Sequence, residues 1–335
     1  MEIDDSFFMN LALKEAWKYQ LLTYPNPAVG AVVLENKKIL AIQAHQKAGN
    51  SHAEVLALLK AYEVKSKKKI DFNRNDAKLA HKFLLSLERD FFKDFEIFIT
   101  LEPCSHAGKT PSCALLLSKI KPKRVVIGAI DPISSHSGGV KILKEAKILT
   151  KLLLLQEAKD LLEPFKIWQK RAFVIFKLAQ SLNGKIGGGY LSSKESLIHV
   201  HKIREVIDKL IIGGNTVRVD RPKLDCRFIN SKKAPDIIIF SKEKEFDKTI
   251  PLFNVSERKV EITQNLDEIF AKPSLLLVEG GGNTLKALRE KLDWFLLYLT
   301  PKLSENEISY NLDQNIRFLH QEKIGKDLLI WSRFE

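Results

Sequence analysis

Cysteine is scarce in this sequence of 335 residues, and long apolar runs are missing. Three cysteines, Cys104, Cys113 and Cys226, are too few for a disulfide framework and are typical of a protein from a reducing compartment. No apolar run approaches the roughly 20 residues that span a bilayer. The initial stretch MEIDDSFFMN is acidic and lacks the basic start of a secretory signal. We therefore expect a cytoplasmic protein that does not enter a membrane.

Acidic side chains are outnumbered: 41 Asp and Glu face 54 Lys and Arg, which gives a net charge of +13. Such a balance attracts nucleic acid or small phosphorylated molecules. The basic runs are not interleaved with aromatic residues, as they are in proteins that bind single strands. A run such as KSKKK at 65–69 is typical of a solvated surface, so charge alone does not indicate a nucleic-acid partner.

The spacing of apolar residues predicts alternating strands and helices. Helical spacing runs over residues 6–22, and the pattern of 28–45 predicts a hairpin with its turn at 35–38. The segments 95–100 and 124–130 predict further strands. This alternation is typical of layered α/β folds.

A helix and an insertion precede the strand at 95–100. His52 starts a helical pattern, and Ser51 is the expected N-cap. Residues 65–95 are rich in Lys and Phe. We expect them to form a mostly helical insertion that serves as a surface elaboration or an oligomer contact.

A second cycle of strands and helices begins near residue 171. It includes a long polar stretch at 215–227 that is expected to be a loop. The helical pattern of 156–169 predicts a connector. We therefore expect two domains, residues 1–170 and 171–335.

His52, Cys104 and Cys113 offer one nitrogen and two thiolates, a set that suits zinc better than a hard metal. Three protein ligands leave a fourth position for water, whose pKa zinc lowers to about 7. Glu54 lies two positions from His52, so on a helix it points elsewhere and is placed to move protons rather than to bind metal. A His-x-Glu motif followed by Pro-Cys is typical of zinc deaminases.

Eight residues separate Cys104 from Cys113, whereas two separate the cysteines in the commonest zinc-deaminase pattern. Both thiolates can reach one metal if residues 105–112 form a compact loop. That loop carries His106 and Lys109, whose polar groups can contact a substrate phosphate or ring.

The segments YPNPAVGAVV, HAEV and TLEPCSHAGKTPSC, with the dipeptide DP at 131–132, resemble the deaminase half of the bifunctional riboflavin-biosynthesis deaminase–reductases. That family deaminates 2,5-diamino-6-(5-phosphoribosylamino)pyrimidinone and then reduces the ribosyl group to a ribityl chain with NADPH. The long cysteine spacing is a mark of the family. Ile133 departs from it, because the family has an asparagine after this dipeptide. The resemblance implies substrate contacts at Asn26, His45, His106, Lys109 and Asp131.

The second half resembles the reductase half of the same family in KLAQSLNGKI, GGNTVRVDRPKLDCR and VEGGGNTL. Glycines before a helix let backbone amides meet a phosphate, and arginine forks suit a substrate phosphate. The resemblance implies substrate contacts at Arg204, Leu224, Arg227 and Glu279. It implies NADPH contacts at Gln180, Thr216, Asp220, Gly280, Gly281, Gly282, Asn283 and Thr284.

Three features of the second half bear on this resemblance. Asn183 replaces the family's aspartate, and the loop at 187–190 is shortened, with Tyr190 as the nearest replacement for the family's serine and tryptophan contacts. The segment EGGGNT is not the Gly-x-Gly-x-x-Gly fingerprint of doubly wound folds. The implied architecture is a cytidine-deaminase-like layered α/β domain followed by a dihydrofolate-reductase-like α/β domain.

Two other functions stay open. A zinc deaminase of a nucleoside or nucleic-acid base, with an inactive or unrelated C-terminal domain, would share the metal motif. A basic nucleic-acid-binding protein with a structural zinc would use a fourth protein ligand and need no proton shuttle. Glu54 and the motifs of the second half favour the bifunctional enzyme. We then expect Zn²⁺ and NADPH as cofactors, a small phosphorylated pyrimidine as substrate, no nucleic acid, and a homo-oligomer of two or four chains.

Overall fold

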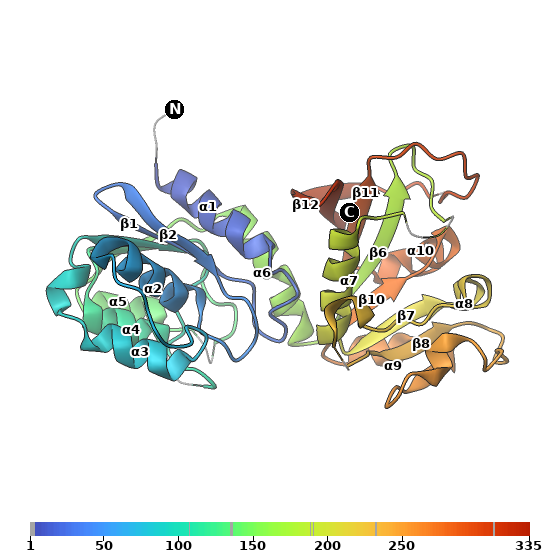
Figure 1. The fold of residues 1–335 in the computed structure, drawn as a ribbon, viewed down its shortest axis with the longest axis horizontal. Helices are drawn as coiled ribbons and strands as arrows, with labels where there is room; N and C mark the ends of the chain where they lie inside the picture. Colours follow the sequence, from blue (N-terminus) through green and yellow to red (C-terminus); the bar gives the residue numbers. More distant parts are fainter. Residues whose placement is uncertain are drawn as a thin grey trace. The chain divides into compact units, whose positions relative to one another are not determined.

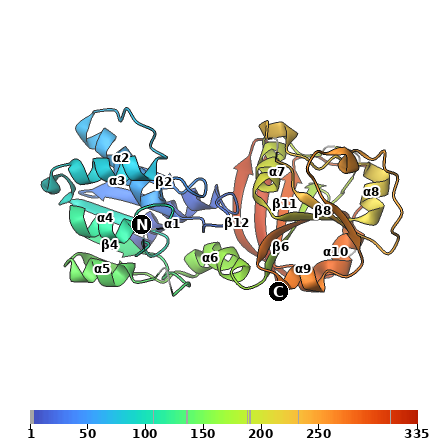
Figure 2. The ribbon, with the colours of Figure 1, turned by 90° about the horizontal axis from the view of Figure 1, so that it is seen from below.

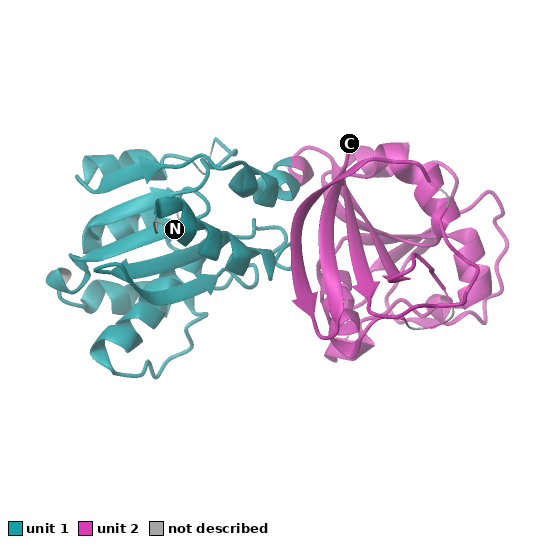
Figure 3. Cartoon of the chain, turned by 90° about the horizontal axis from the view of Figure 1, so that it is seen from above, with its two compact units in different colours: residues 1–166 teal, residues 167–335 magenta. Residues whose placement is uncertain are grey.

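The computed structural model describes residues 4–106, 108–134, 137–187, 189, 191–231, 233–310 and 312–335. The chain divides into two compact units, Met1–Lys166 and Ile167–Glu335 (Figure 3). The division falls within α6 (Gln156–Trp168), the helix expected to be a connector. Tyr190 lies outside the described residues.

Unit 1 is built on a five-stranded sheet with the order β2-β1-β3-β4-β5 (Figure 1). The first two strands form the expected hairpin, and its turn residues Asn36 and Lys37 both have positive φ, as hairpin turns that match the strand twist require. The last three strands run parallel, so their carboxyl ends share one edge of the sheet. The strands are β1 (Gly30–Glu35), β2 (Lys38–Ala44), β3 (Phe95–Ile99), β4 (Arg124–Ile127) and β5 (Leu149–Leu152).

Helices cover both faces of this sheet (Figure 2). On one face α1 (Asp5–Trp17) and α6 pack together, and Gly128 lets Met9 and Ala158 approach the sheet. The other face shares one apolar core with four helices. These are α2 (Ala53–Ser66), α3 (Ala77–Ser86), α4 (Cys113–Ile120) and α5 (Gly139–Glu145). Unit 1 is therefore a three-layer α/β domain.

Two local expectations for unit 1 are wrong. His52, not Ser51, is the N-cap residue of α2, and the Ser51 hydroxyl donates to the Arg74 carbonyl at 2.7 Å rather than accepting from an amide at the helix start. The insertion is helical only in part. A non-helical stretch over 67–76 precedes α3, and a short 3₁₀ helix (Arg89–Phe92) follows it.

Unit 2 is built on an eight-stranded sheet with the order β12-β13-β11-β6-β10-β7-β8-β9. The strands from β11 to β9 in this order are parallel, and β13 runs antiparallel to both of its neighbours. The bounds are β6 (Ala172–Ser181), β7 (Lys209–Gly213), β8 (Asp236–Phe240), β9 (Val260–Thr263), β10 (Ser274–Glu279), β11 (Trp294–Thr300), β12 (Ile316–Ile324) and β13 (Asp327–Phe334).

The helices of unit 2 also lie on both faces of its sheet. Leu285 of α10 (Gly282–Leu288) and Phe270 of α9 (Asp267–Ala271) join the core on one face. On the other face, His199 of α7 (Lys194–Val206) packs against Trp331. The stretch 215–227 is not entirely a loop, because it begins within α8 (Gly214–Asp220).

Short 3₁₀ turns at Arg227–Ile229, Pro251–Asn254 and Arg289–Lys291 complete unit 2. None of the helices in the described ranges has the length and apolar character needed to cross a membrane.

Candidate active sites

The three expected metal ligands lie together in unit 1. His52 caps α2, Cys104 follows β3, and Cys113 is the first residue of α4. Their ligand atoms all lie within 4.8 Å of one another. His52 Nδ1 is 3.7 Å from Cys104 Sγ and 3.4 Å from Cys113 Sγ. Nitrogen and sulfur ligands of a tetrahedral zinc lie about 3.5 Å apart, so the donor set and its spacing fit Zn²⁺.

The start of α4 stabilises the thiolate of Cys104. The Cys113 backbone N–H points at Cys104 Sγ, 3.4 Å away. Hydrogen bonds from Cys113 and His52 lower the pKa of Cys104, whereas the hydrogen bond with Cys104 and burial raise the pKa of Cys113. Ser112 caps the helix, since its hydroxyl accepts from the Leu115 amide and donates to the Cys104 carbonyl. The lowered pKa of Cys104 favours its thiolate, which is the form of cysteine that binds metal.

Thr110 holds the second ring nitrogen of His52. Its Oγ1 lies 3.1 Å from His52 Nε2, and the residue is only 8% exposed. Because Nδ1 faces both sulfurs and needs its lone pair for a metal, Nε2 carries the proton and donates a hydrogen bond to Thr110 Oγ1. Partners of this kind fix the tautomer and ring orientation of metal-binding histidines. The loop between the cysteines therefore orients the third ligand as well.

Glu54 lies in the first turn of α2 and is 4% exposed. Burial raises the pKa of its carboxyl, and the charges of His52 and Cys104 act on that pKa as well. Among the described residues, the possible ligand group holds His52 and the two cysteines but not Glu54. A buried carboxyl beside a ligand set, but outside it, is suited to accept and return a proton.

His45 connects the insertion to Asn26. His45 Nδ1 lies 3.2 Å from the Ser51 carbonyl, which can only accept, so this nitrogen carries the proton. Burial lowers the pKa of His45 to about 4, so the ring is neutral at pH 7 and Nε2 accepts from Asn26 Nδ2 at 3.1 Å. Ser51 in turn donates to two insertion carbonyls, through Oγ to Arg74 and through N to Asn75. The insertion is thus more than a surface elaboration, because it supports two residues at which the resemblance implies substrate.

The other expected substrate contacts of unit 1 lie on two loops. His106 and Lys109 are exposed on the loop between the cysteines. Asp131 follows β4 and is buried, and its Oδ1 accepts from the Ile133 amide at 2.9 Å. That bond uses only the backbone of residue 133, so it does not depend on the family's asparagine.

Glu102 is a structural residue of the site to which the sequence analysis gave no role. Its buried carboxylate accepts from the amides of Asp131, Gly138 and Val140. It thereby holds the loop that carries Asp131. Its position directly before the Pro-Cys motif is the sequence feature that could have indicated this role.

The residues expected to form the reductase site lie along one edge of the sheet in unit 2. β6, β10 and β7 run parallel side by side, so their carboxyl ends meet. Gln180 lies at the end of β6, Glu279 ends β10, and the turn 280–284 follows it directly. Thr216 and Asp220 lie on α8, which follows β7. Ligands of open α/β sheets bind outside the carboxyl ends of the strands.

Glycines shape the two turns at this edge. A β-carbon at Gly213 would lie 2.2 Å from Thr284 Oγ1, so the turns after β7 and β10 touch only because residue 213 is glycine. Gly281 faces open space, since no atom of the described residues beyond its chain neighbours lies within 4 Å of a β-carbon placed there. Gln180 Oε1 accepts from the Tyr310 hydroxyl at 2.6 Å. An accessible glycine backbone beside a side-chain amide fits a phosphate-bearing cofactor such as NADPH.

A buried ion pair at the same edge joins two of the expected substrate residues. Arg204 donates to both carboxylate oxygens of Glu279, at 2.8 and 2.9 Å. Lys177 Nζ lies 3.7 Å from Glu279, its register partner across β6 and β10. Although burial raises the pKa of Glu279, the charges of Arg204 and Lys177 hold it below the usual value. Lys177 is the first residue of KLAQSLNGKI, and this position in the motif is the sequence feature that could have indicated it.

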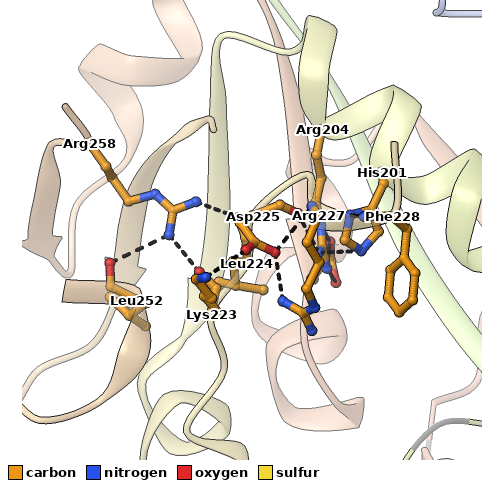
Figure 4. A network of polar contacts seen from close by, with 10 residues as sticks. His201, Arg204, Lys223, Leu224, Asp225, Arg227, Phe228, Leu252 and Arg258 are labelled. Atoms are coloured by element: carbon orange, nitrogen blue, oxygen red, sulfur yellow. Dashed lines mark hydrogen bonds and ion pairs between the residues drawn. The ribbon is translucent and has the colours of Figure 1, made fainter. Parts of the chain in front are cut away.

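Leu224 and Arg227 lie on the segment that leads from α8 to β8 (Figure 4). Arg227 Nη1 donates to Asp225 Oδ1 at 2.6 Å, and Lys223 Nζ lies 3.1 Å from Asp225 Oδ2. Arg204 Nη1 donates to the Asp225 carbonyl at 3.3 Å. The segment therefore links the two arginines at which the resemblance implies substrate.

Asn183, at the position where the resemblance implies an aspartate, makes three hydrogen bonds. Its Oδ1 accepts from Ser181 Oγ and from the Ser304 amide, and its Nδ2 donates to the Ser304 carbonyl at 2.9 Å. A carboxylate could accept both bonds but could not donate the third. The amide ties the turn after β6 to the segment after β11.

The third cysteine, Cys226, lies outside the possible ligand group of the described residues. It is 1% exposed, and burial raises its pKa to about 11. A buried neutral thiol of this kind behaves as a small apolar side chain.

Two families match the chain. The family described as the cytidine and deoxycytidylate deaminase zinc-binding region matches residues 2–129, and the RibD C-terminal domain matches residues 172–330. The chain is 31% identical over 380 residues to the riboflavin biosynthesis protein RibD of Aquifex aeolicus, with 99% of each protein covered. It is 32% identical over 244 residues to the RibD of Bacillus amyloliquefaciens, which covers 70% of this chain and 58% of that protein.

Solved structures share the fold of both units. A diaminohydroxyphosphoribosylaminopyrimidine deaminase/5-amino-6-(5-phosphoribosylamino)uracil reductase from Thermotoga maritima aligns with a TM-score of 0.65 and 26% identity, covering 98% of each chain. RibD of Acinetobacter baumannii aligns with a TM-score of 0.66 and 22% identity, covering 99% of each chain. The expectation of a deaminase-like α/β domain followed by a reductase-like α/β domain is confirmed.

Proposed function

Because this chain belongs to the family of bifunctional riboflavin-biosynthesis deaminase–reductases, we propose which residues carry out its two reactions and with which cofactors. Unit 1 uses Zn²⁺ to deaminate 2,5-diamino-6-(5-phosphoribosylamino)pyrimidinone. Unit 2 uses NADPH to reduce the ribosyl group of the product to a ribityl chain. The observation that carries the proposal is the ligand group of His52, Cys104 and Cys113 with the buried carboxyl of Glu54 beside it.

In the deamination, His52, Cys104 and Cys113 would hold the metal. When bound, zinc lowers the pKa of a coordinated water and so supplies a nucleophile near neutral pH. Glu54 accepts the proton of the attacking water and returns it to the departing ammonia.

The other residues of unit 1 hold the ribotide in place for this step. Asn26 is oriented by His45, so its amide oxygen stays available to a donor on the pyrimidine. His106 and Lys109 are suited to the phosphate, and Asp131 to a donor of the ribotide.

In the reduction, the turn Gly280–Thr284 and Gln180, with Thr216 and Asp220 of α8, would hold the cofactor. When bound, NADPH supplies the hydride. Arg204, Arg227 and Glu279 position the ribotide, with the arginines suited to its phosphate. The net charge of +13 adds a general attraction for both phosphorylated ligands.

The purified full chain, loaded with zinc, tests this proposal. Incubation with the diaminopyrimidine ribotide should release ammonia without NADPH, and added NADPH should then be oxidised. Cytidine and single-stranded DNA serve as control substrates and should release none. Ammonia from cytidine but not from the ribotide would overturn the proposal and favour a nucleoside deaminase.

We also propose that the protein works in the cytoplasm as a homo-oligomer of two or four chains, without nucleic acid as a partner. Size-exclusion chromatography with light scattering measures the number of chains directly. A monomer at micromolar concentration would contradict this assembly.

A further inference from the structure

The segment that carries Leu224 and Arg227 has an unusual backbone. Arg221, Leu224 and Asn230 have φ angles of 42°, 56° and 53°, in the left-handed region that favours glycine. Residues other than glycine are unfavourable in that region. Such conformations persist only where surrounding contacts hold them, and they gather at functional sites.

One side chain holds the segment at Leu224. Arg258 lies just before β9 and donates to the backbone carbonyls of Lys223 and Leu224, to Lys223 at 2.6 Å (Figure 4). It also donates to the carbonyls of Pro235 at 2.9 Å and Leu252 at 3.4 Å. The guanidinium therefore ties the left-handed residue Leu224 to the beginning of β8 and to a neighbouring 3₁₀ turn.

Arginine is suited to this task for a chemical reason. Its planar fork presents five N–H donors in fixed directions, whereas lysine has three donors on one nitrogen. Burial lowers the pKa of Arg258 to about 10, so the group still carries its charge at neutral pH. Four carbonyls from three separate stretches of chain converge on it.

The segment that Arg258 binds also contacts the buried ion pair of Arg204 and Glu279. The Asp225 carbonyl accepts from Arg204, and Arg204 binds Glu279. The Asp225 carboxylate accepts from Arg227. Movement of the Leu224 carbonyl would therefore shift the neighbouring Asp225 and with it both arginines.

We propose that Arg258 is a positioning residue of the reductase site. It preforms the substrate segment, so that Leu224 and Arg227 lie where the ribotide binds before the ribotide arrives. This role rests on the proposed reduction of the ribotide by unit 2. Arg258 itself touches neither substrate nor cofactor, and it acts through the backbone of Lys223 and Leu224.

The test compares three variants of the full, zinc-loaded chain. Arg258→Met keeps the apolar stem and removes all donors, and it should raise the KM for the deaminated ribotide about tenfold or more, because small misplacements of binding groups are costly. The KM for NADPH and the rate of ammonia release should stay within twofold of wild type. The KM of Arg258→Lys for the deaminated ribotide should lie between those of Arg258→Met and wild type.

Arg221→Met is the matched control. Arg221 lies on the same segment, but its exposed side chain binds Asp247 and Thr249 rather than backbone carbonyls, so this variant should keep the wild-type KM.

An unchanged ribotide KM in Arg258→Met, with wild-type reduction, would overturn the positioning role. So would a lower kcat with both KM values unchanged, which is the result expected of a merely structural residue that reduces the fraction of folded enzyme. If unit 2 of Arg258→Met does not fold, the same comparison of KM values between Arg258→Lys and wild type tests the positioning role. A wild-type chain that does not reduce the ribotide would instead overturn the proposed function.

Discussion

Glu54 lies beside three metal ligands, yet its carboxyl stands outside the ligand group. We predict that Glu54→Gln keeps zinc and loses ammonia release by about 10²–10⁴-fold, because an amide cannot accept and return the proton. Metal analysis and an ammonia assay on the same sample measure both. Glu145→Gln on α5, with a side chain that is 65% exposed, is the control. Full deaminase activity in Glu54→Gln would remove Glu54 from the mechanism.

Thr110 shows how a residue without metal-binding chemistry can set metal affinity. We predict that Thr110→Val lowers zinc affinity about 10- to 100-fold, because His52 Nε2 then loses the partner that fixes its tautomer. Competition with a chelator measures this without any assay of activity. Thr110→Ser keeps the oxygen and should bind zinc like wild type. Equal affinity in Thr110→Val and wild type would show that the hydroxyl does not matter.

At the scale of secondary structure, two turns carry the proposed cofactor site. Gly213 has a φ of −67°, so alanine suits its backbone, and the obstacle is only the contact with Thr284. We predict that Gly213→Ala raises the KM for NADPH about tenfold while the ribotide KM changes little. Thr284→Ala removes the atom that clashes, so the double variant should recover part of the loss in a double-mutant cycle. Purely additive effects would contradict this explanation.

Sequence predicted those parts of the sites that depend on local spacing. Glu54 follows His52 by two positions, so one motif places the two residues near each other. The strands that carry Gln180 and Glu279 are also visible as apolar runs. Their common edge follows from the parallel alternation of strands and helices.

Sequence could not predict contacts that arise only when distant segments pack together. Ser51 looked like a helix cap, but its hydroxyl bonds Arg74 of the insertion instead. Arg258 lies in a charged stretch with no motif, and its carbonyl partners are set by the path of the chain through three segments. Every residue has a backbone carbonyl, so composition and spacing do not indicate which carbonyls accept hydrogen bonds from a side chain. Such residues become visible only in the folded molecule.

At the scale of the whole molecule, buried neutral histidines make stability depend on pH. Burial lowers the pKa of His199 to about 4, whereas in the unfolded chain it is near 6.5. Above pH 6.5 neither state binds this proton. Below it the unfolded state does, so the free energy of unfolding should fall by about 1.4 kcal/mol per pH unit between pH 6.5 and 4.

Glutamine does not titrate. We therefore predict that His199→Gln removes the contribution of His199 to the slope of the free energy of unfolding against pH. Urea unfolding between pH 7 and 5, followed by tryptophan fluorescence, measures it, since Trp294 and Trp331 are buried in unit 2. Lys194→Gln, at an exposed position of the same helix, is the control and should keep the wild-type slope. Equal slopes in wild type and His199→Gln would show that His199 is protonated in the folded protein.

The partly exposed Cys104 makes the chain a reporter of its own metal content, because Cys113 and Cys226 are both buried. A thiol reagent reaches only thiolates that are accessible, and Cys226 is buried with a pKa of about 11. Cys104 is masked while zinc is bound and is unmasked when zinc leaves, whereas burial also keeps the reagent from Cys113. The fraction of Cys104 that reacts with a coloured reagent therefore gives the fraction of metal-free protein, and Cys113 and Cys226 react only when their units unfold.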